Sequence, residues 1–185
     1  MGGLLKSWRR RRERRSAMLG AYRQIVERAR EPALYRAWGV PDTLDGRFEV
    51  LALHAFLVLH RLKREGDSTA EFAQALFDTM FADLDGALRE MGASDLGVGP
   101  RIKAMARGFY GRVAAYERGL SDGAALAAAL RRNLFGTAAA PAEAQVDAAV
   151  RYMRRQAEAL AAMPVAALLE GRMPFAPLAT ASEKG

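Results

Sequence analysis

The 185-residue sequence contains no cysteine, only two histidines and only four lysines. Without cysteine the chain has no disulfide framework, no thiolate metal ligand and no thiol nucleophile. No window approaches the roughly 20 apolar residues that a membrane-spanning helix needs. The basic N-terminus is not followed by the apolar region and cleavage site of a secretory signal peptide. These absences favour a cytoplasmic or matrix-like compartment.

Motifs for catalysis are also missing. The sequence has no P-loop, no nucleophile-elbow serine and no complete dinucleotide fingerprint. His54 and His60 lie six residues apart, on different sides of a helix, so they cannot form the i, i+4 pair of a metalloprotease site. The carboxylates of Asp42, Asp45 and Asp95 sit in glycine-containing turns, where aspartate usually serves the turn itself. We therefore expect no enzymatic activity, no cofactor and no metal.

What the sequence has is helical periodicity over most of its length. Apolar residues make up 51% of the chain, which is enough for one globular domain. We predict an all-α fold: a single compact multi-helix domain over residues 16–172, with a basic arm at 1–15 and a tail at 173–185. The segment Phe48–Leu62 has apolar residues on both sides of its helical wheel. Such a helix is normally buried, so we expect it at the centre of the core.

Residues 83–116 predict two helices joined by a polar connection. The first helix should close with an ion pair between Asp85 and Arg89 and with Gly92 in a left-handed conformation. Gly97, Gly99 and Pro100 are expected to keep the connection non-helical up to the start of the second helix. The second helix carries apolar residues at helical spacing on one face, namely Ile102, Met105, Phe109, Val113, Tyr116 and Leu120.

Further helices are predicted before and after this pair. One spans about residues 16–29, and another spans 70–91 with Ser68 as its cap. Ser121 is expected to cap a third, to about residue 134, and Pro141 to begin a fourth, to about residue 163. The tail from Met173 onward is interrupted by prolines and is expected to be extended.

The net charge of +7 is concentrated in the N-terminal arm. Residues 1–15 carry a net charge of +6, and the other 170 residues carry only +1. The arm combines apolar residues that can share a helical face with a cluster of cations: Leu4, Leu5, Lys6, Trp8, Arg9, Arg10, Arg11, Arg12, Arg14 and Arg15. This pattern predicts binding to an anionic membrane surface. Binding to RNA through phosphates and a solvated terminus are the alternatives, and an arginine-rich transit peptide is disfavoured by Glu13.

Two blocks of the sequence resemble a known family. The blocks are VPDTLDGRFEVLALHAFLVLHRL at 40–62 and LREMGASDLGVGPRIKAMARGFYGRVAAY at 88–116. Together they are similar to the ubiquinol–cytochrome c chaperones of mitochondria and related bacteria, over roughly residues 18–172. The family pattern favours glycine where this chain has Ala93, and the basic arm lies outside the shared block.

The resemblance implies a helical, non-enzymatic assembly factor that binds newly made cytochrome b for the ubiquinol–cytochrome c reductase. It also implies action at the ribosome, a small helical partner protein and a place at the cytoplasmic or matrix face of the membrane. An adaptor bound to membrane or RNA, without a specific client, is the alternative function. The expected contact residues lie in two polar loops and the adjoining apolar seam: Asp42, Asp45, Arg47, Arg89, Glu90, Asp95, Lys103, Met91, Met105 and Phe109. Their alternative role is to hold the loops together.

Overall fold

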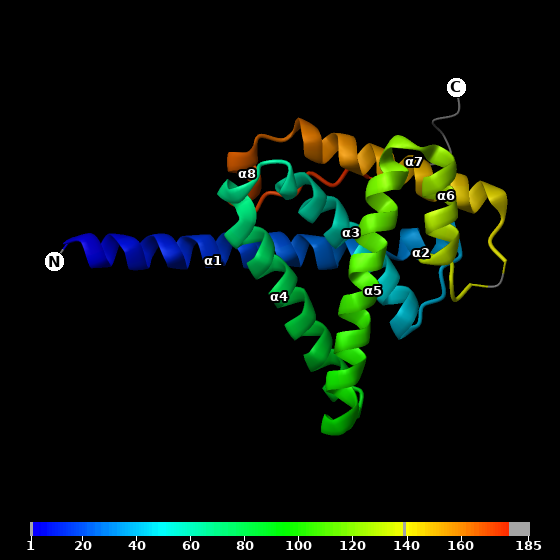
Figure 1. Ribbon diagram of the computed structural model, residues 1–185, viewed down its shortest axis with the longest axis horizontal. Helices are drawn as coiled ribbons and strands as arrows, with labels where there is room; N and C mark the ends of the chain where they lie inside the picture. Colours follow the sequence, from blue (N-terminus) through cyan, green and yellow to red (C-terminus); the bar gives the residue numbers. More distant parts are fainter. Residues whose placement is uncertain (1, 139, 178–185) are drawn as a thin grey trace.

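The computed structural model describes residues 2–138 and 140–177, apart from the side chains of residues 2–6 and 10. Within these residues the chain forms eight α-helices and no strand (Figure 1), which confirms the all-α prediction. The helices are α1 (Gly2–Ala29), α2 (Pro32–Trp38), α3 (Leu44–Lys63), α4 (Asp67–Glu90), α5 (Asp95–Ser121), α6 (Gly123–Arg132), α7 (Glu143–Ala162) and α8 (Val165–Leu169).

Helix α3 lies at the centre of the domain, as its sequence predicted. It is capped by Thr43, whose hydroxyl accepts a hydrogen bond from the backbone N–H of Gly46 at 3.2 Å. Thirteen of its twenty residues are buried, and helices α1, α4, α5 and α7 all pack against it. A helix buried on every side orders the helices around it, because each of them must bury its own apolar face on α3.

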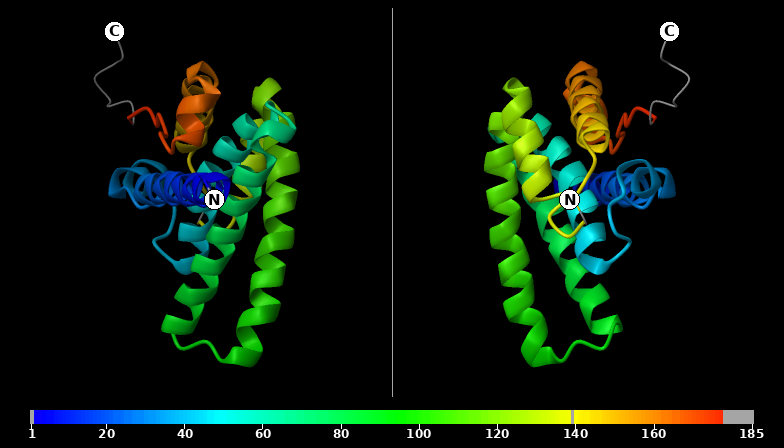
Figure 2. Two further views of the ribbon diagram at one scale, coloured as in Figure 1. Left: turned by 90° about the vertical axis from the view of Figure 1, so that its left-hand side faces the viewer. Right: turned by 90° about the vertical axis from the view of Figure 1, so that its right-hand side faces the viewer.

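Helices α4 and α5 form a hairpin that projects away from the rest of the domain (Figures 1 and 2). The turn between them spans only residues 91–94. Gly92 has a φ of +85°, the left-handed conformation predicted for it. The N–H of Ala93 donates to the carbonyl of Leu88 at 3.1 Å, which closes α4.

The prediction that Gly97, Gly99 and Pro100 stay outside the second helix is wrong. Helix α5 begins at Asp95 and contains all three residues. Proline at the sixth position leaves only the carbonyl of Leu96 without its N–H partner, and this carbonyl lies near the exposed end of the hairpin, where water can satisfy it. The turn is stabilised by Val98, which is buried with 1% of its surface exposed.

Four helix starts also differ from the predictions. Helix α7 begins at Glu143, and Pro141 lies before it. Helix α1 begins at Gly2 instead of residue 16, so the basic segment and the first core helix are one continuous helix, whose first half extends beyond the domain in Figure 1. Ser68 lies inside α4 and donates its hydroxyl to the carbonyl of Glu65, so it is not the cap. Asp122, not Ser121, caps α6, because its carboxylate accepts from two backbone N–H groups.

His54 is buried in α3 and is neutral. Its Nδ1 lies 2.7 Å from the carbonyl of Val50, and its Nε2 lies 2.8 Å from the hydroxyl of Tyr152 on α7. A carbonyl can only accept, so Nδ1 carries the proton and Nε2 accepts from Tyr152. Burial lowers the pKa of His54 to about 4. The histidine is thus structural, as its sequence context predicted.

The neutral state of His54 makes stability depend on pH. Between pH 6.5 and about 4 the unfolded chain takes up a proton at this residue and the folded chain does not. The free energy of unfolding should therefore fall by up to about 3 kcal/mol as the pH drops through this window. The His54→Gln variant should lose this part of the pH dependence in urea unfolding.

The His60→Gln variant is the matched control, because His60 lies on the same helix but is partly exposed. It should keep the pH dependence of the wild-type chain. An identical slope in His54→Gln and wild type would show that His54 is not the group responsible.

Candidate functional site

The tip of the α4–α5 hairpin is held by an ion-pair cluster around Arg89. Its Nε lies 3.1 Å from Asp85 on α4, the i, i+4 pair that the sequence predicted, and its Nη1 contacts Asp95 at the start of α5. Arg89 therefore connects the two helices across the turn. Glu90 beside it is exposed. Reversing the charge of Arg89 would place three carboxylates together, so this residue has a structural role at the tip.

The second predicted loop is brought against the same hairpin. Arg47 binds Asp42 with two hydrogen bonds of 2.6 and 3.1 Å, and this contact lowers the pKa of Asp42. Asp45, in the first turn of α3, lies 3.5 Å from Arg101 in the second turn of α5. The two polar segments that the sequence placed 40 to 60 residues apart are thus neighbours, joined by a contact that sequence reasoning missed.

Beneath these surface pairs lies a buried ion pair that the sequence analysis did not identify. Glu49 on α3 accepts two hydrogen bonds from Arg112 on α5, one from Nε at 2.7 Å and one from Nη2. The side chains are only 7% and 17% exposed, respectively. Arg112 also lies over the ring of Phe48 at 5.2 Å. The signal in the sequence was Glu49, a glutamate inside the segment Phe48–Leu62 that was predicted to be the core helix.

Large apolar side chains are exposed along one line of α5. Leu96 is 91% exposed and Tyr110 is 61% exposed, and the exposed Lys103 lies midway between them. Spacings of seven residues fall within about 20° of two full turns, so the three side chains share one stripe. We name Leu96, Lys103 and Tyr110 the α5 stripe. It runs about 21 Å from the tip towards the domain, and Met91, 58% exposed, lies across the turn from its start.

The domain end of the α5 stripe opens into an apolar groove between α3, α4 and α5. The groove encloses about 230 Å³ and is lined by Tyr110 together with Phe77 and Phe109. Phe109, expected at an accessible seam, is only 1% exposed and forms the floor of this groove. Met105 is half-buried against the core. The ion pair between Lys63 and Glu117, at 2.8 Å, forms part of the polar edge of the groove.

The structure places the described part of the basic segment on the exposed half of α1. Trp8 is 63% exposed, and Arg12 lies over its ring at 5.9 Å. The arginines of this half are also exposed, namely Arg9, Arg11, Arg12, Arg14 and Arg15. The side chains of Leu4, Leu5, Lys6 and Arg10, which belong to the same prediction, lie outside the described residues.

In the part of the chain that the structure describes, no helix is both long and apolar enough to cross a membrane. Among the same residues, no group of three or more acidic or histidine side chains is placed to hold a metal ion. The distinctive surface of the described residues is thus an exposed apolar stripe beside a groove. The fold and this surface define an all-helical domain whose most unusual feature is a candidate protein-contact surface.

Comparison with known proteins assigns the family. Residues 36–175 match the family model described as ubiquinol–cytochrome c chaperone. The chain belongs to this family, whose members act in assembly of the ubiquinol–cytochrome c reductase, as the resemblance of its two sequence blocks predicted. The family model begins after α1, so the whole of this helix lies outside the matched region.

Individual relatives agree with this assignment. The chain is 30% identical to ubiquinol–cytochrome c reductase complex assembly factor 1 of Xenopus laevis over 78% of its own length and 72% of that protein. It is 29% identical to the Homo sapiens protein of the same name, over 88% of this chain and 54% of the human one. A crystal structure of the Cbp3 homolog from Brucella abortus is similar with a TM-score of 0.82 and 38% identity, covering 95% of this chain and 97% of that one.

The buried ion pair gives a test of how the hairpin is positioned. Replacing Glu49 with alanine leaves the largely buried Arg112 without its partner, and this should lower the free energy of unfolding by about 3 kcal/mol. Urea unfolding measures the change. Asp42→Ala is the matched control, because it removes the same kind of carboxylate–arginine pair at an exposed site. Its melting temperature should stay at the wild-type value. Equal losses in the two variants would contradict the assigned role of Glu49.

Proposed function

We propose that this protein is a non-enzymatic chaperone that binds newly made cytochrome b during assembly of the ubiquinol–cytochrome c reductase. Family membership supports the assembly role, and the names of the relatives refer to assembly of the same complex. The observation that carries the proposal for this chain is the α5 stripe. A leucine with 91% of its surface exposed, at the end of a projecting hairpin, gains nothing from the domain's own core.

The α5 stripe suits a helix of a membrane-protein client. Such a helix exposes apolar side chains before it reaches its final partners, and it can lie along α5 with contacts to Leu96 and Tyr110. Met91 adds a flexible apolar side chain that adapts to different surfaces. The groove beneath Tyr110 offers a site for a bulky client side chain. Lys103, between the two apolar positions, contacts a polar or acidic group of the client.

The polar segments beside the tip contact the loops of the client in this proposal. Asp42, Arg47 and Glu90 are exposed, and Arg47 pairs with Asp42. Asp95 and Arg89 act by keeping the tip closed. The small helical partner protein and the ribosome, both implied by the resemblance, remain predictions for the same protein.

Replacing Leu96 with serine tests the client surface. The change should weaken cytochrome b binding about tenfold, the size of a typical interface hot spot, and should leave the melting temperature unchanged because Leu96 is exposed. Cytochrome b recovered with the tagged protein from solubilised membranes gives the binding, and reductase haem absorbance gives assembly. Leu19→Ser is the control, since it removes a leucine that is 38% exposed elsewhere, on α1. Normal recovery with Leu96→Ser would remove the stripe from consideration.

We propose further that the first half of α1 binds an anionic membrane surface, which holds the chaperone at the cytoplasmic face of a bacterial membrane or the matrix face of a mitochondrial one. Trp8 is exposed beside Arg12 on a helix that extends beyond the domain (Figure 1). Tryptophan favours the headgroup region, and each arginine near anionic lipid contributes about 1 kcal/mol. This location would bring the hairpin close to a client that has just been inserted.

Replacing four arginines of this half with glutamine tests membrane binding; they are Arg11, Arg12, Arg14 and Arg15. The variant should no longer sediment with vesicles that contain anionic phospholipid at low salt, because its electrostatic attraction is lost. The control replaces the same number of exposed arginines elsewhere, namely Arg23, Arg30, Arg36 and Arg107. Sedimentation by the first variant equal to wild type would contradict the proposal, and retention on RNA without vesicle binding would favour the adaptor alternative.

A further inference from the structure

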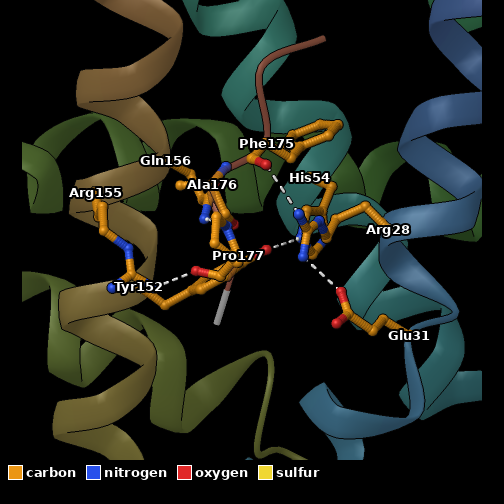
Figure 3. Close-up of polar contacts among 9 residues, drawn as sticks. All are labelled: Arg28, Glu31, His54, Tyr152, Arg155, Gln156, Phe175, Ala176 and Pro177. Carbon is orange, nitrogen blue, oxygen red and sulfur yellow. Dashed lines mark hydrogen bonds and ion pairs between the residues drawn. The ribbon is translucent and has the colours of Figure 1, made fainter. Parts of the chain in front are cut away.

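The last described residues of the chain lie between α1 and α7 and hydrogen-bond to both helices (Figure 3), and we call the space that they fill the groove. We name residues 171–177 the C-terminal strap. On the α1 side, Gln24 Nε2 donates to the carbonyl of Gly171 at 2.5 Å, and its Oε1 accepts from the N–H of Met173 at 3.1 Å. Gly171 comes so close to α1 that a Cβ there would lie 2.4 Å from the carbonyl oxygen of Ala17. The strap is thus held tightly against α1 at its start.

Both walls of the groove continue to bind the strap further along. Arg28 on α1 donates to the carbonyl of Phe175 at 2.9 Å. On α7, Gln156 exchanges two hydrogen bonds of 2.8 Å with the N–H and carbonyl of Ala176. Arg155 donates to the carbonyl of Pro177 at 2.7 Å. Strap and walls therefore share six hydrogen bonds, each between a wall side chain and the strap's main chain.

Contacts to the main chain recognise its non-helical path, which includes a tight turn where the N–H of Phe175 donates to the carbonyl of Met173 at 3.0 Å, and they do not depend on the side chains. The N–H groups bonded to the walls belong to Met173 and Ala176, so proline is tolerated at 174 and 177, where the strap has it. Peptide-binding grooves work in the same way: main-chain hydrogen bonds supply affinity, and a side-chain pocket supplies selectivity.

The domain also contacts the strap through the side chain of Phe175. The ring of Phe175 packs edge-on against His54, with centroids 5.5 Å apart, and Arg28 lies 6.0 Å from the same ring (Figure 3). Met173 is also buried. The groove therefore favours a segment with an apolar residue two positions before an aromatic one.

The strap contacts both polar and apolar groups of the domain. Gln156 is completely buried, and Gln24 and Arg28 bind the strap from the opposite wall, whereas Met173 and Phe175 pack against the hydrophobic core. Gln24, Arg28 and Gln156 would hydrogen-bond water if the strap left, so the polar part of the groove is compatible with solvent. Permanent interfaces are more apolar, whereas exchangeable ones are more polar.

We propose that the groove between α1 and α7 is a binding site for non-helical peptide segments, occupied in this structure by the chain's own C-terminal strap. The competing occupant is a non-helical, uncharged segment of the client, with an apolar and an aromatic residue at the spacing of Met173 and Phe175. The identity of this occupant rests on the proposed function; the existence of the peptide site does not. A tethered strap has a local concentration in the millimolar range, so a client segment displaces it only when the client is also held elsewhere.

A peptide-binding assay tests the site in the full chain. The probe is a fluorescent synthetic peptide that copies residues 169–177, and its binding is measured by anisotropy. The Phe175→Ala chain weakens the tethered strap and should bind the probe at least tenfold more tightly than wild type. A matched probe with alanine at the phenylalanine position should bind at least tenfold more weakly to the same chain.

Changes in the walls then show where the probe binds. Adding Gln156→Leu to the Phe175→Ala chain should abolish probe binding. If that variant does not fold, Gln24→Leu on the opposite wall serves the same purpose. Equal probe binding by wild type and Phe175→Ala, equal binding of the two probes, or binding unaffected by the wall variants would each overturn the site.

A separate measurement tests whether a segment of the client is the competing occupant. The Phe175→Ala chain should recover at least twofold more cytochrome b than wild type, since the competing strap is weakened. Unchanged recovery together with tight probe binding would overturn the client as the occupant but not the peptide site. Failure of the proposed function itself would appear instead as no recovery of cytochrome b with the wild-type chain.

Discussion

The burial of the middle of α3, from Phe48 to Val58, is the constraint on which the rest of the structure depends. A helix with apolar side chains on every face is stable in water only inside a shell of other helices, and α1, α4, α5 and α7 provide that shell. Each of these surrounding helices packs its apolar face against α3 or against a neighbouring helix. Large apolar side chains that remain exposed, such as Leu96 and Tyr110, are therefore exceptions that need another explanation.

Polar groups on α3 fix how the shell is arranged around it. Glu49 pairs with Arg112 on α5, and His54 accepts from Tyr152 on α7. Burying Glu49 or His54 without a hydrogen-bond partner would cost free energy. Helices α5 and α7 therefore pack against α3 in the positions that bring Arg112 to Glu49 and Tyr152 to His54. The first contact positions the hairpin, and the second positions the wall of the groove that holds the C-terminal strap. One buried helix thus connects both candidate binding sites.

The features that could be predicted from the sequence are those encoded locally. The apolar face of α5 and the pair between Asp85 and Arg89 follow from spacings of three and four residues. The error at Pro100 arose because tertiary packing competed with a residue preference. Glycine and proline disfavour a helix, but the burial of Val98 stabilises the first turns of α5. Family resemblance supplied the assembly role, which periodicity alone could not.

The candidate sites depended on contacts that local patterns do not encode. Asp45 and Arg101 are 56 residues apart, and Arg28 is 147 residues from the strap carbonyl that it binds. The strap is bound through its main chain, so no pattern of residue types in the sequence predicts where it binds. Likewise, the α5 stripe became visible only when exposure showed which of the many apolar residues have no partner in the core.

The central claim is that the α5 stripe contacts cytochrome b in the cell. Its most direct test is a photo-crosslinking amino acid placed at position 96 in a functional chain, followed by identification of the crosslinked protein during reductase assembly. The account predicts a crosslink to cytochrome b from position 96 and none from the same probe at position 19 on α1. A chain that supports reductase assembly and yields no crosslink to cytochrome b from position 96 would contradict the account.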